Sequence, residues 1–394
     1  MKKLRNTLYL ALSIMMGVCA LSGCIEEYEA DISADDSNLL VVEGAICSSQ
    51  LNKFYLSRTQ AIKSSTPRIV TGAKVSVCGS DGSEYPAQAT DGYYACEIGD
   101  LDPDAMYYLH IETDGEVYES EPQKPLRTEK IAEVLGVQNT PESDIDVLVT
   151  PAEPYDPDQV NYYSWTYDET WEVRPDYTTV MYYDTLKKQP VIKSGLFPQR
   201  GWKNGTGTTI MVGASHNYEG HHIRRLKMYD IDHGGERVYY RYSGLVHQRA
   251  ISKAEYEYEV SRREVAYEMG GLFTPLPSAL PTNIHCLTSK KHVIGFVGCA
   301  LNTSEYRFFL NAKDFSIRHP QKGDTRLWVE EPSARDCCLL VAKGMFLCEW
   351  EDSTRTASRK LRTAWAYDYQ LDVRCLGAYI EEPDFWSLEE NVSY

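Results

Sequence analysis

The sequence predicts a mainly β protein with two β-sandwich domains, the first immunoglobulin-like and the second β-rich with one inserted α-helix and a long irregular insertion. Short apolar segments with period-two alternation recur from residue 39 onward, and glycine-containing turns separate them. The chain has 29 tyrosines and 9 phenylalanines, a balance typical of half-buried strand positions. Its 394 residues provide enough material for two or three domains.

The composition limits the function classes open to the chain. Its 40 Lys+Arg residues are outnumbered by 57 Asp+Glu residues, which gives a formal net charge of -17 at pH 7. Binding to nucleic acid requires a basic surface that neutralises phosphates, so this class is excluded. With 25% charged and 43% hydrophobic residues, the chain is neither wholly disordered nor a multi-span membrane protein.

We predict that residues 1–23 are a lipoprotein signal peptide. A basic start precedes an apolar stretch over residues 8–21, which is too short for a stable transmembrane helix. The stretch ends in Leu21-Ser22-Gly23-Cys24, which resembles a bacterial lipobox, whose cysteine is lipidated. An incidental cysteine after an ordinary signal peptide is the alternative. We expect lipidation at Cys24 and a lipid anchor in the outer membrane, because several acyl chains suffice for stable attachment.

Residues 24–38 are predicted to be an acidic tether. Four acidic residues follow the lipobox cysteine closely, namely Glu26, Glu27, Glu29 and Asp31. This start resembles the export tag that sends Bacteroidota lipoproteins to the cell surface. A solvated tail explains the same charges equally well. We expect the mature protein on the cell surface, with the periplasmic face of the outer membrane as the alternative.

Residues 39–120 are predicted to form the immunoglobulin-like sandwich. Six short apolar segments alternate with turns, and three of these turns carry Asp-Gly pairs, in which glycine supplies a positive φ. Tyr107 follows a Leu-x-Pro corner and is similar to the tyrosine corner of immunoglobulin-like domains, where the hydroxyl ties a loop to the sheet. Cys78 and Cys96 lie on segments expected to be neighbours, and they either form a disulfide or remain buried thiols.

Two prolines among polar residues predict a domain boundary at 121–125, because proline cannot join a β ladder. Residues 126–394 are then the second sandwich domain. Its expected strands lie at 145–149, 160–173, 238–246, 293–297, 307–310, 339–341 and 364–369. The polar, glycine-rich stretch 174–235 is predicted to be the irregular insertion, and long loops of this kind are usually functional or mobile.

One helix is expected near residues 252–269. Ser252 and Glu255 have the spacing of a capping box, and Gly270-Gly271 supplies the C-terminal end. The following loop, 270–284, contains three prolines and several apolar residues. We expect these to lock the helix onto the second sandwich, with an apolar patch for a partner as the alternative. The apolar residues in question are Leu272, Phe273, Leu276 and Leu280.

Several short motifs occur in a fixed order along the chain. They are Leu40-Val41-Val42-Glu43-Gly44, Gly72-Ala73-Lys74-Val75, Gly92-Tyr93-Tyr94, Thr282-Asn283-Ile284, Val293-Ile294-Gly295-Phe296 and Pro383-Asp384-Phe385-Trp386. Together with the lipobox, they resemble the Bacteroidota outer-membrane lipoprotein family with a domain of unknown function, DUF4249. Members commonly carry a cysteine pair before the last motif, whereas this chain has only Cys375. The resemblance implies an accessory role beside a TonB-dependent outer-membrane receptor.

The expected insertion contains a group of potential metal ligands. The group comprises His216, His221, His222, Asp230, Asp232, His233 and Glu236. Histidines at this density could hold a transition metal, but a hydrated loop explains them better, so we predict neither a metal nor a cofactor. The sequence lacks a Gly-x-Ser-x-Gly elbow, a His-Glu-x-x-His zinc motif and a phosphate-binding loop. We therefore do not expect an enzyme, although a spatially assembled site is compatible with any sequence spacing.

Aromatic residues are concentrated in the second domain, and three tryptophans there are candidate ligand contacts. They are Trp165, Trp171 and Trp202. Flat aromatic rings at a surface stack on sugar rings or peptide side chains. The alternation in residues 160–173 places half of the aromatic residues in a core instead, and this interpretation is favoured.

The sequence thus predicts a membrane-anchored, surface or periplasm-facing lipoprotein. It is expected to act as a non-catalytic binding or accessory component with a TonB-dependent transporter. A structural, adhesin-like surface protein is the alternative, and a hydrolase with its site in residues 174–235 is a further one.

Overall fold

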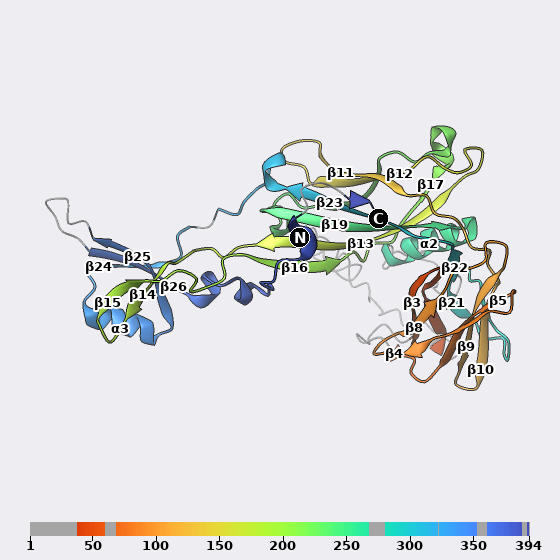
Figure 1. Cartoon of the computed structure of the whole chain (residues 1–394), viewed down its shortest axis with the longest axis horizontal. Coiled ribbons are helices and arrows are strands. Elements are labelled where there is room, and N and C mark those ends of the chain that lie inside the picture. Colours follow the sequence, from red (N-terminus) through yellow and green to blue (C-terminus); the bar gives the residue numbers. More distant parts are fainter. Residues whose placement is uncertain are drawn as a thin grey trace, which may run out of the picture.

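The chain folds into three β-rich units arranged in a row, as the computed structural model shows (Figure 1). The structure describes residues 38–59, 68–267, 280–321, 323–352, 361–387 and 392–393. We define an N-terminal unit (38–120 and 280–300), a central unit (126–173, 201–251 and 304–317) and a distal unit (177–198 and 324–367). The predicted mainly β class is confirmed. The central and distal units were, however, predicted as one domain, residues 126–394.

The N-terminal unit is a sandwich of two sheets. The first has the order β21 (Val293–Gly295), β1 (Leu40–Glu43), β3 (Gln50–Arg58), β8 (Tyr94–Ile98) and β7 (Gln88–Ala89), with β4 (Arg68–Ile69) on β3. The second has the order β20 (Ile284–Cys286), β10 (Glu116–Ser120), β9 (Tyr107–Thr113), β5 (Lys74–Gly79) and β6 (Glu84–Pro86). A separate pair joins β2 (Ala45–Cys47) to β22 (Gly298–Ala300). Alternating side chains from both sheets form one core.

The predicted tyrosine corner is present in this sandwich. The Tyr107 side chain is fully buried, and its hydroxyl accepts a hydrogen bond from the Asp102 backbone N–H at 2.8 Å. The same hydroxyl donates to Asp81 Oδ2 at 2.9 Å. The two cysteines considered for a disulfide, Cys78 and Cys96, are both free thiols. Cys96 lies in the core, where its thiol donates to the Tyr85 carbonyl.

The N-terminal unit is completed by a segment from much later in the chain. Strands β21 and β22 pair in parallel with β1 and β2, and β20 extends the opposite sheet beside β10. Ile284, Val293 and Val297 are buried in the core of this unit. The predicted boundary, residues 121–125, is also bound to this late segment, since the Glu121 N–H donates to the Asn283 carbonyl at 2.7 Å. The expected division into contiguous domains 39–120 and 126–394 therefore needs correction.

The central unit packs a large sheet against a small one. The large sheet has the order β16 (Gly201–Thr206), β13 (Tyr162–Val173), β19 (Arg241–Ile251), β23 (Ser304–Asn311) and β27 (Val392–Ser393), with β17 (Met211–Ala214) also on β13. The small sheet has the order β11 (Ile131–Gln138), β12 (Ile145–Pro151) and β18 (Leu226–Ile231). The rings of Tyr167 and Tyr229 stack across the interface, with centroids 3.8 Å apart.

Residues 174–235 are not the irregular insertion that the sequence predicted. They contain β16, β17 and β18 of the central unit and the hairpin of β14 (Met181–Asp184) and β15 (Gln189–Ile192) in the distal unit. The Asn204-Gly205 pair, a dipeptide that is typical of turns, lies within β16. Gly205 is needed there because a Cβ would stand 2.7 Å from Glu169 Oε1 on the neighbouring strand. In strands this short and rich in polar residues, apolar and polar positions alternate too little to predict a strand.

The distal unit combines the β14–β15 hairpin with a second sheet and a helix. The sheet has the order β24 (Leu327–Glu330), β26 (Leu361–Tyr367) and β25 (Met345–Asp352), and helix α3 (Ala334–Ala342) packs beside it. Residues 339–341 lie in this helix, so the prediction of a strand there is wrong. Ser333 and Asp336 form a capping box at the start of α3, and Cys337 and Leu340 are buried three residues apart. A run of three apolar residues does not distinguish a strand from a helix.

The expected helix is α2 (Lys253–Tyr267), which follows β19 directly. Ser252 Oγ accepts a hydrogen bond from the Glu255 N–H at 3.1 Å, as in a capping box. Tyr258 and Val265 pack in a small core with Leu280, Leu39 and Ile294, so the described end of the apolar loop packs the helix against the N-terminal unit and not, as expected, the second sandwich. Phe273 and the other loop residues before 280 lie outside the described residues.

Short 3-10 helices lie in the connections. They are η2 (Ser215–Asn217), η3 (Glu219–His221), η4 (Glu236–Val238), η6 (Ala312–Asp314), η7 (Asp368–Gln370), η8 (Val373–Leu376) and η9 (Asp384–Ser387). Within the part of the chain that the structure describes, no helix is both long and apolar enough to cross a membrane. Cys24, the predicted lipidation site, lies outside that part.

Candidate functional site

One face of the large central sheet is polar, and we call it the polar face. Along β13, the even-numbered side chains from Ser164 to Thr170 share this face, while Tyr163, Trp165 and Tyr167 point into the core. The pairing of β13 with β19 extends the polar face onto β19. Thr166 is paired with His247, and Asp168 with Leu245.

His247 lies at the centre of the polar face between two carboxylates. Its Nε2 atom is 3.2 Å from Asp168 Oδ2, and its Nδ1 atom is 3.0 Å from Glu305 Oε1. Asp168 Oδ1 accepts a further hydrogen bond from the Thr206 hydroxyl at 2.8 Å. Both ring nitrogens of His247 are therefore occupied, and the imidazole holds β13, β19 and β23 in register.

A cavity of about 340 Å³, which we call the junction cavity, lies at one end of the polar face. It is enclosed by the central sheet, by α2 and by the turn between β1 and β2. Arg249 forms a bidentate ion pair with Glu255, with one Nη1–Oε2 distance of 3.2 Å, and both side chains are largely buried. Gly298 allows this approach, because a Cβ there would clash with the Glu255 carboxylate.

The charges of the junction cavity are paired with one another. Arg262 contacts Glu259 at 2.8 Å within α2 and Glu43 at 3.0 Å at the end of β1. Burial raises the pKa of the Glu259 carboxyl, although Arg262 opposes the shift. Burial also raises the pKa of Tyr258 to about 12. Because these groups satisfy one another, the cavity wall is best explained as an ionic junction between units.

A second cavity, of about 490 Å³, lies at the other end of the polar face, and we call it the C-terminal cleft. Its floor is the polar face, with Asp168, Thr170 and Asn204, and its opposite wall is formed by Tyr379 and Phe385. Both aromatic side chains are half-buried, whereas Asp168 and Asn204 are exposed. The cleft therefore combines accessible aromatic surface with accessible polar groups.

The polar groups of the C-terminal cleft are held in place by hydrogen bonds. Asn204 Oδ1 accepts from the Thr170 hydroxyl at 2.9 Å and from the Tyr379 hydroxyl at 3.0 Å. This fixes the amide plane and leaves the Asn204 NH₂ group without a partner among the described residues. The Arg307 guanidinium lies 3.6 Å from the centre of the Phe385 ring and donates to Ser243 Oγ at 3.1 Å.

The wall of the cleft belongs to residues 378–387, which we call the C-terminal segment. Trp202 and Tyr379 exchange two backbone hydrogen bonds, at 2.9 and 3.0 Å. Trp386 is buried, contacts Trp202 edge-to-face at 6.1 Å, and accepts a hydrogen bond at its carbonyl from Arg241. The Pro-Asp-Phe-Trp motif thus anchors the segment through Trp386 and presents Phe385 to the cleft.

The three predicted ligand-contact tryptophans are all buried. Trp165 and Trp171 lie in the core of the central unit, at 2% and 8% exposure. Trp202 is 3% exposed, because the C-terminal segment covers it. None of the three offers an open ring for stacking, so the core interpretation is the correct one. The aromatic residues that line the C-terminal cleft are instead Tyr379 and Phe385. Phe385 belongs to the Pro-Asp-Phe-Trp motif, whereas no sequence pattern pointed to Tyr379.

The expected histidine cluster does not converge on a metal site. His222 Nε2 contacts the Pro151 carbonyl at 2.8 Å, and His221 Nδ1 is 3.4 Å from the Ser215 carbonyl. Among the described residues, one set of potential metal ligands lies close together. This set is Asp144, Asp232 and His233.

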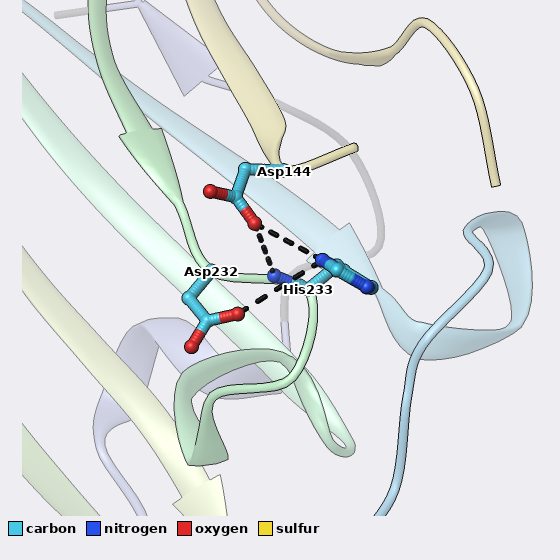
Figure 2. A group of neighbouring side chains, drawn as sticks. All are labelled: Asp144, Asp232 and His233. Carbon is cyan, nitrogen blue, oxygen red and sulfur yellow. Dashed lines mark hydrogen bonds and ion pairs between the residues drawn. The ribbon is translucent and has the colours of Figure 1, made fainter. Parts of the chain in front are cut away.

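Figure 2 shows how these three side chains lie at the end of β18. Asp144 Oδ1 accepts from the His233 backbone N–H at 3.1 Å and lies 3.0 Å from His233 Nδ1. The bond from His233 holds the pKa of the Asp144 carboxyl below its usual value. Asp232 Oδ1 is 3.9 Å from the same Nδ1 and accepts from the Gly234 N–H at 2.8 Å. These bonds close the turn after β18, so the cluster has a sufficient structural explanation.

Comparison with solved structures gave a match to a point mutant of Salmonella alpha-2-macroglobulin. The match has 9% sequence identity and a TM-score of 0.17, and it covers 94% of this chain but 22% of that chain. A likeness at this level bears on neither fold nor function. The family comparison is informative, because its match extends from directly after Cys24 to β23. It ends before the Pro-Asp-Phe-Trp motif, so that part of the expected resemblance lies outside the match. Since the model of the family described as domain of unknown function (DUF4249) matches residues 25–306, the chain belongs to that family.

Proposed function

We propose that this protein is a lipid-anchored, non-catalytic binding or accessory component of the outer membrane that works with a TonB-dependent transporter. The observation that carries the proposal is the lipobox Leu21-Ser22-Gly23-Cys24 in register with a signal peptide and followed by an acidic tether. Such an anchor places the three folded units beside the membrane, where an accessory protein has access to a transporter.

The polar face supports a binding role over a hydrolytic one. Hydrolysis by a hydroxyl nucleophile requires a general base with a free acceptor atom. Thr166 is the cross-strand neighbour of His247, but both His247 nitrogens are engaged by Asp168 and Glu305. The C-terminal cleft beside this group is open and has fixed polar side chains, which is the usual arrangement of a binding site.

Replacement of the lipobox cysteine tests the anchor. We expect Cys24→Ala to move the protein from the outer-membrane fraction to the soluble periplasmic fraction, because the acyl chains supply the attachment. The matched control is Cys19→Ala, which changes a cysteine inside the signal peptide and should leave the fractionation unchanged. Retention of Cys24→Ala in the membrane fraction would contradict the lipoprotein assignment.

Affinity purification from detergent-solubilised outer membranes tests the partner. We expect the tagged full-length chain to retain a TonB-dependent receptor, identified by mass spectrometry, in amounts comparable to its own. The control is a tagged lipoprotein of unrelated fold from the same membrane. An adhesin-like protein would be anchored in the same way but would retain no receptor, so this result would favour the alternative.

A further inference from the structure

The C-terminal cleft contains chemistry that the anchor and the fold do not explain. Its volume of about 490 Å³ falls within the range of small-molecule sites, about 300–1,000 Å³. Its floor is built on three hydrogen-bonded strands, β16, β13 and β19, and its wall is fixed by the buried Trp386. A site on such rigid elements is formed before a ligand arrives.

We propose that the C-terminal cleft binds a neutral saccharide. This inference deepens the proposed function and rests on it, since it names the ligand class of a binding component. A sugar ring presents apolar C–H groups on its faces and hydroxyl groups around its edge. A binding site for it therefore needs flat aromatic surface together with hydrogen-bonding groups of both kinds.

The aromatic surface is supplied by Tyr379 and Phe385. Both side chains are half-buried and line the cleft, so part of each remains accessible. Phe385 is backed by the Arg307 guanidinium at 3.6 Å, and Tyr379 is fixed by its hydroxyl bond to Asn204 at 3.0 Å. Rings held in this way lose little conformational freedom when a ligand stacks on them.

The hydrogen-bonding groups are of both kinds, as a hydroxyl requires. The Asn204 NH₂ group has two donors without partners among the described residues, because the hydrogen bonds from Thr170 and Tyr379 both go to the side-chain oxygen. Asp168 is an exposed acceptor that also lines the cleft. The side-chain oxygen of Thr206, next to Asp168, retains acceptor capacity after donating to Asp168 Oδ1 at 2.8 Å.

The charge of the cleft favours a neutral ligand over a charged one. Among the described residues, two carboxylates line the cleft, and one of them, Glu169, is buried and contacts Tyr242 and Arg237. The exposed Asp168 carboxylate and the Arg307 guanidinium bring charges of both signs to the lining. A charged ligand of either sign would therefore meet a like charge in the cleft, whereas a neutral ligand would not.

Binding to named oligosaccharides tests the proposal. The mature chain carrying Cys24→Ala is titrated with maltohexaose, cellohexaose, xylohexaose and mannohexaose, with polygalacturonate and heparin as anionic probes. Intrinsic tryptophan fluorescence is a suitable readout, since Trp386 belongs to the C-terminal segment and contacts Trp202 beneath it. We expect saturable binding of at least one neutral probe and weaker binding of both anionic probes.

Substitutions of cleft residues test whether the saccharide binds at the C-terminal cleft. Tyr379→Ala, Phe385→Ala and Asn204→Asp are each expected to weaken the affinity about tenfold or more, because each removes a stacking surface or a pair of donors. Tyr55→Ala, which removes a 44% exposed tyrosine of the N-terminal unit, is the control and should leave the affinity unchanged. Asn204→Asp changes an exposed amide to a carboxylate of the same shape, so we expect it to preserve the fold. It therefore keeps the test valid even where Tyr379→Ala or Phe385→Ala does not fold.

Three outcomes would overturn the inference. They are the absence of binding to every neutral probe, preferential binding of an anionic probe, and binding that the cleft variants do not change. These results leave the anchor and receptor experiments untouched, because those use the full-length chain in its membrane. A failure of saccharide binding is therefore distinguishable from a failure of the proposed function.

Discussion

Single polar side chains shape the late segment of the chain that completes the N-terminal unit. Asn283 is 2% exposed and forms two hydrogen bonds with one residue of the same segment. Its Nδ2 atom donates to the Val297 carbonyl and its Oδ1 atom accepts from the Val297 N–H, each at 2.9 Å. Thr282 Oγ1 donates to the Gly295 carbonyl at 2.7 Å. The Thr-Asn-Ile motif thus shapes the approach of β20 and β21.

Removing the Asn283 amide should destabilise the fold. We expect Asn283→Ala to lower the free energy of unfolding by about 2–5 kcal/mol, because two buried backbone groups lose their partners. Urea denaturation measures the change. Asn139→Ala is the matched control, since Asn139 is exposed and makes one bond to Asp146. Equal effects of the two variants would contradict this account of Asn283.

A buried carboxylate in the central core should make stability depend on pH. Glu169 is 4% exposed, and burial raises its pKa above the ordinary 4.5, although Arg237 and Tyr242 oppose the shift. A carboxyl with a raised pKa binds its proton more tightly in the folded state. Stability therefore falls as the pH rises from about 4.5 through the raised pKa, and the loss persists above it.

Replacing this carboxylate by an amide should remove the pH-dependent loss. We expect the melting temperature of Glu169→Gln, relative to the unmodified protein, to increase from about pH 4 to about pH 8. Glu142→Gln, at an exposed position, is the control and should show no such trend. A difference between Glu169→Gln and the unmodified protein that stays constant with pH would refute the assignment.

At the scale of residues, local features were more predictable than long-range ones. The Tyr107 corner and the Ser252 cap depend on a few adjacent residues, and both were identified from the sequence. The burial of Trp202 depends on a segment nearly two hundred residues later, which no local pattern reveals. The same holds for the cleft, because Asn204 and Tyr379 meet only in the folded chain.

Strands β20, β21 and β22 complete a sandwich that begins at β1. Their buried residues include Ile284, Val293 and Val297, and each such side chain contributes about 1.5–3 kcal/mol by burial. Three of them together approach the whole stability of a small domain, about 5–15 kcal/mol. The strands also cover the edges that β1 and β10 would otherwise expose.

The first half of the N-terminal unit should therefore not fold by itself. We expect a fragment of residues 38–121 to lack cooperative thermal unfolding and to bind a hydrophobic dye such as ANS. Adding a peptide of residues 280–301 should restore the transition, whereas the same peptide with Val293→Asp and Val297→Asp should not. A cooperative transition of the fragment alone would show that residues 38–121 are an autonomous domain.

At the scale of elements, strand prediction succeeded where the alternation was long. Residues 160–173 carry five aromatic residues and the clear period of β13, whereas β16 is short and contains two glycines. Helix α3 was missed because only one of its two buried residues, Leu340, lies in the short Leu-Leu-Val sequence 339–341, and the other, Cys337, precedes it. Both cases show that a period needs several repeats before it can be assigned.

The central and N-terminal units are connected through α2 by a few ionic contacts. Arg249 of the central sheet pairs with Glu255 of α2, and Arg262 of α2 pairs with Glu43 of the N-terminal unit. The Arg249–Glu255 pair is largely buried, so loss of one partner leaves a charge without compensation. The Arg262–Glu43 pair is more exposed and contributes less.

Breaking the buried pair should destabilise the junction between units. We expect Glu255→Leu to lower the free energy of unfolding by about 3–5 kcal/mol, and the double variant Arg249→Met, Glu255→Leu to recover most of this loss. Glu43→Leu, at the exposed pair, should cost about 1 kcal/mol or less. Urea denaturation of all three variants decides the matter. A double variant as unstable as Glu255→Leu would argue against charge burial as the cause.

At the scale of the molecule, the sequence predicted the β class but not the number of units. The distal unit is formed from residues 177–198 and 324–367, and its core comes mainly from the second segment, to which the first adds Tyr183. Their association depends on contacts such as that of Tyr183 with Trp365, whose ring centroids are 6.2 Å apart. Contacts between distant segments leave no periodic signal in the sequence, so the division into units required the structure.

The parallel pairing of β1 with β21 has a consequence for biosynthesis. Leu40 is paired with Val293, so almost the whole central unit must be synthesised between two adjacent strands. Until residue 300 has left the ribosome, β1 has an open edge of the kind that recruits other chains. Pairing over such a sequence distance is also intrinsically slow. The part of the protein that emerges first thus remains dependent on protection, by a chaperone or an export factor, until its late strands arrive.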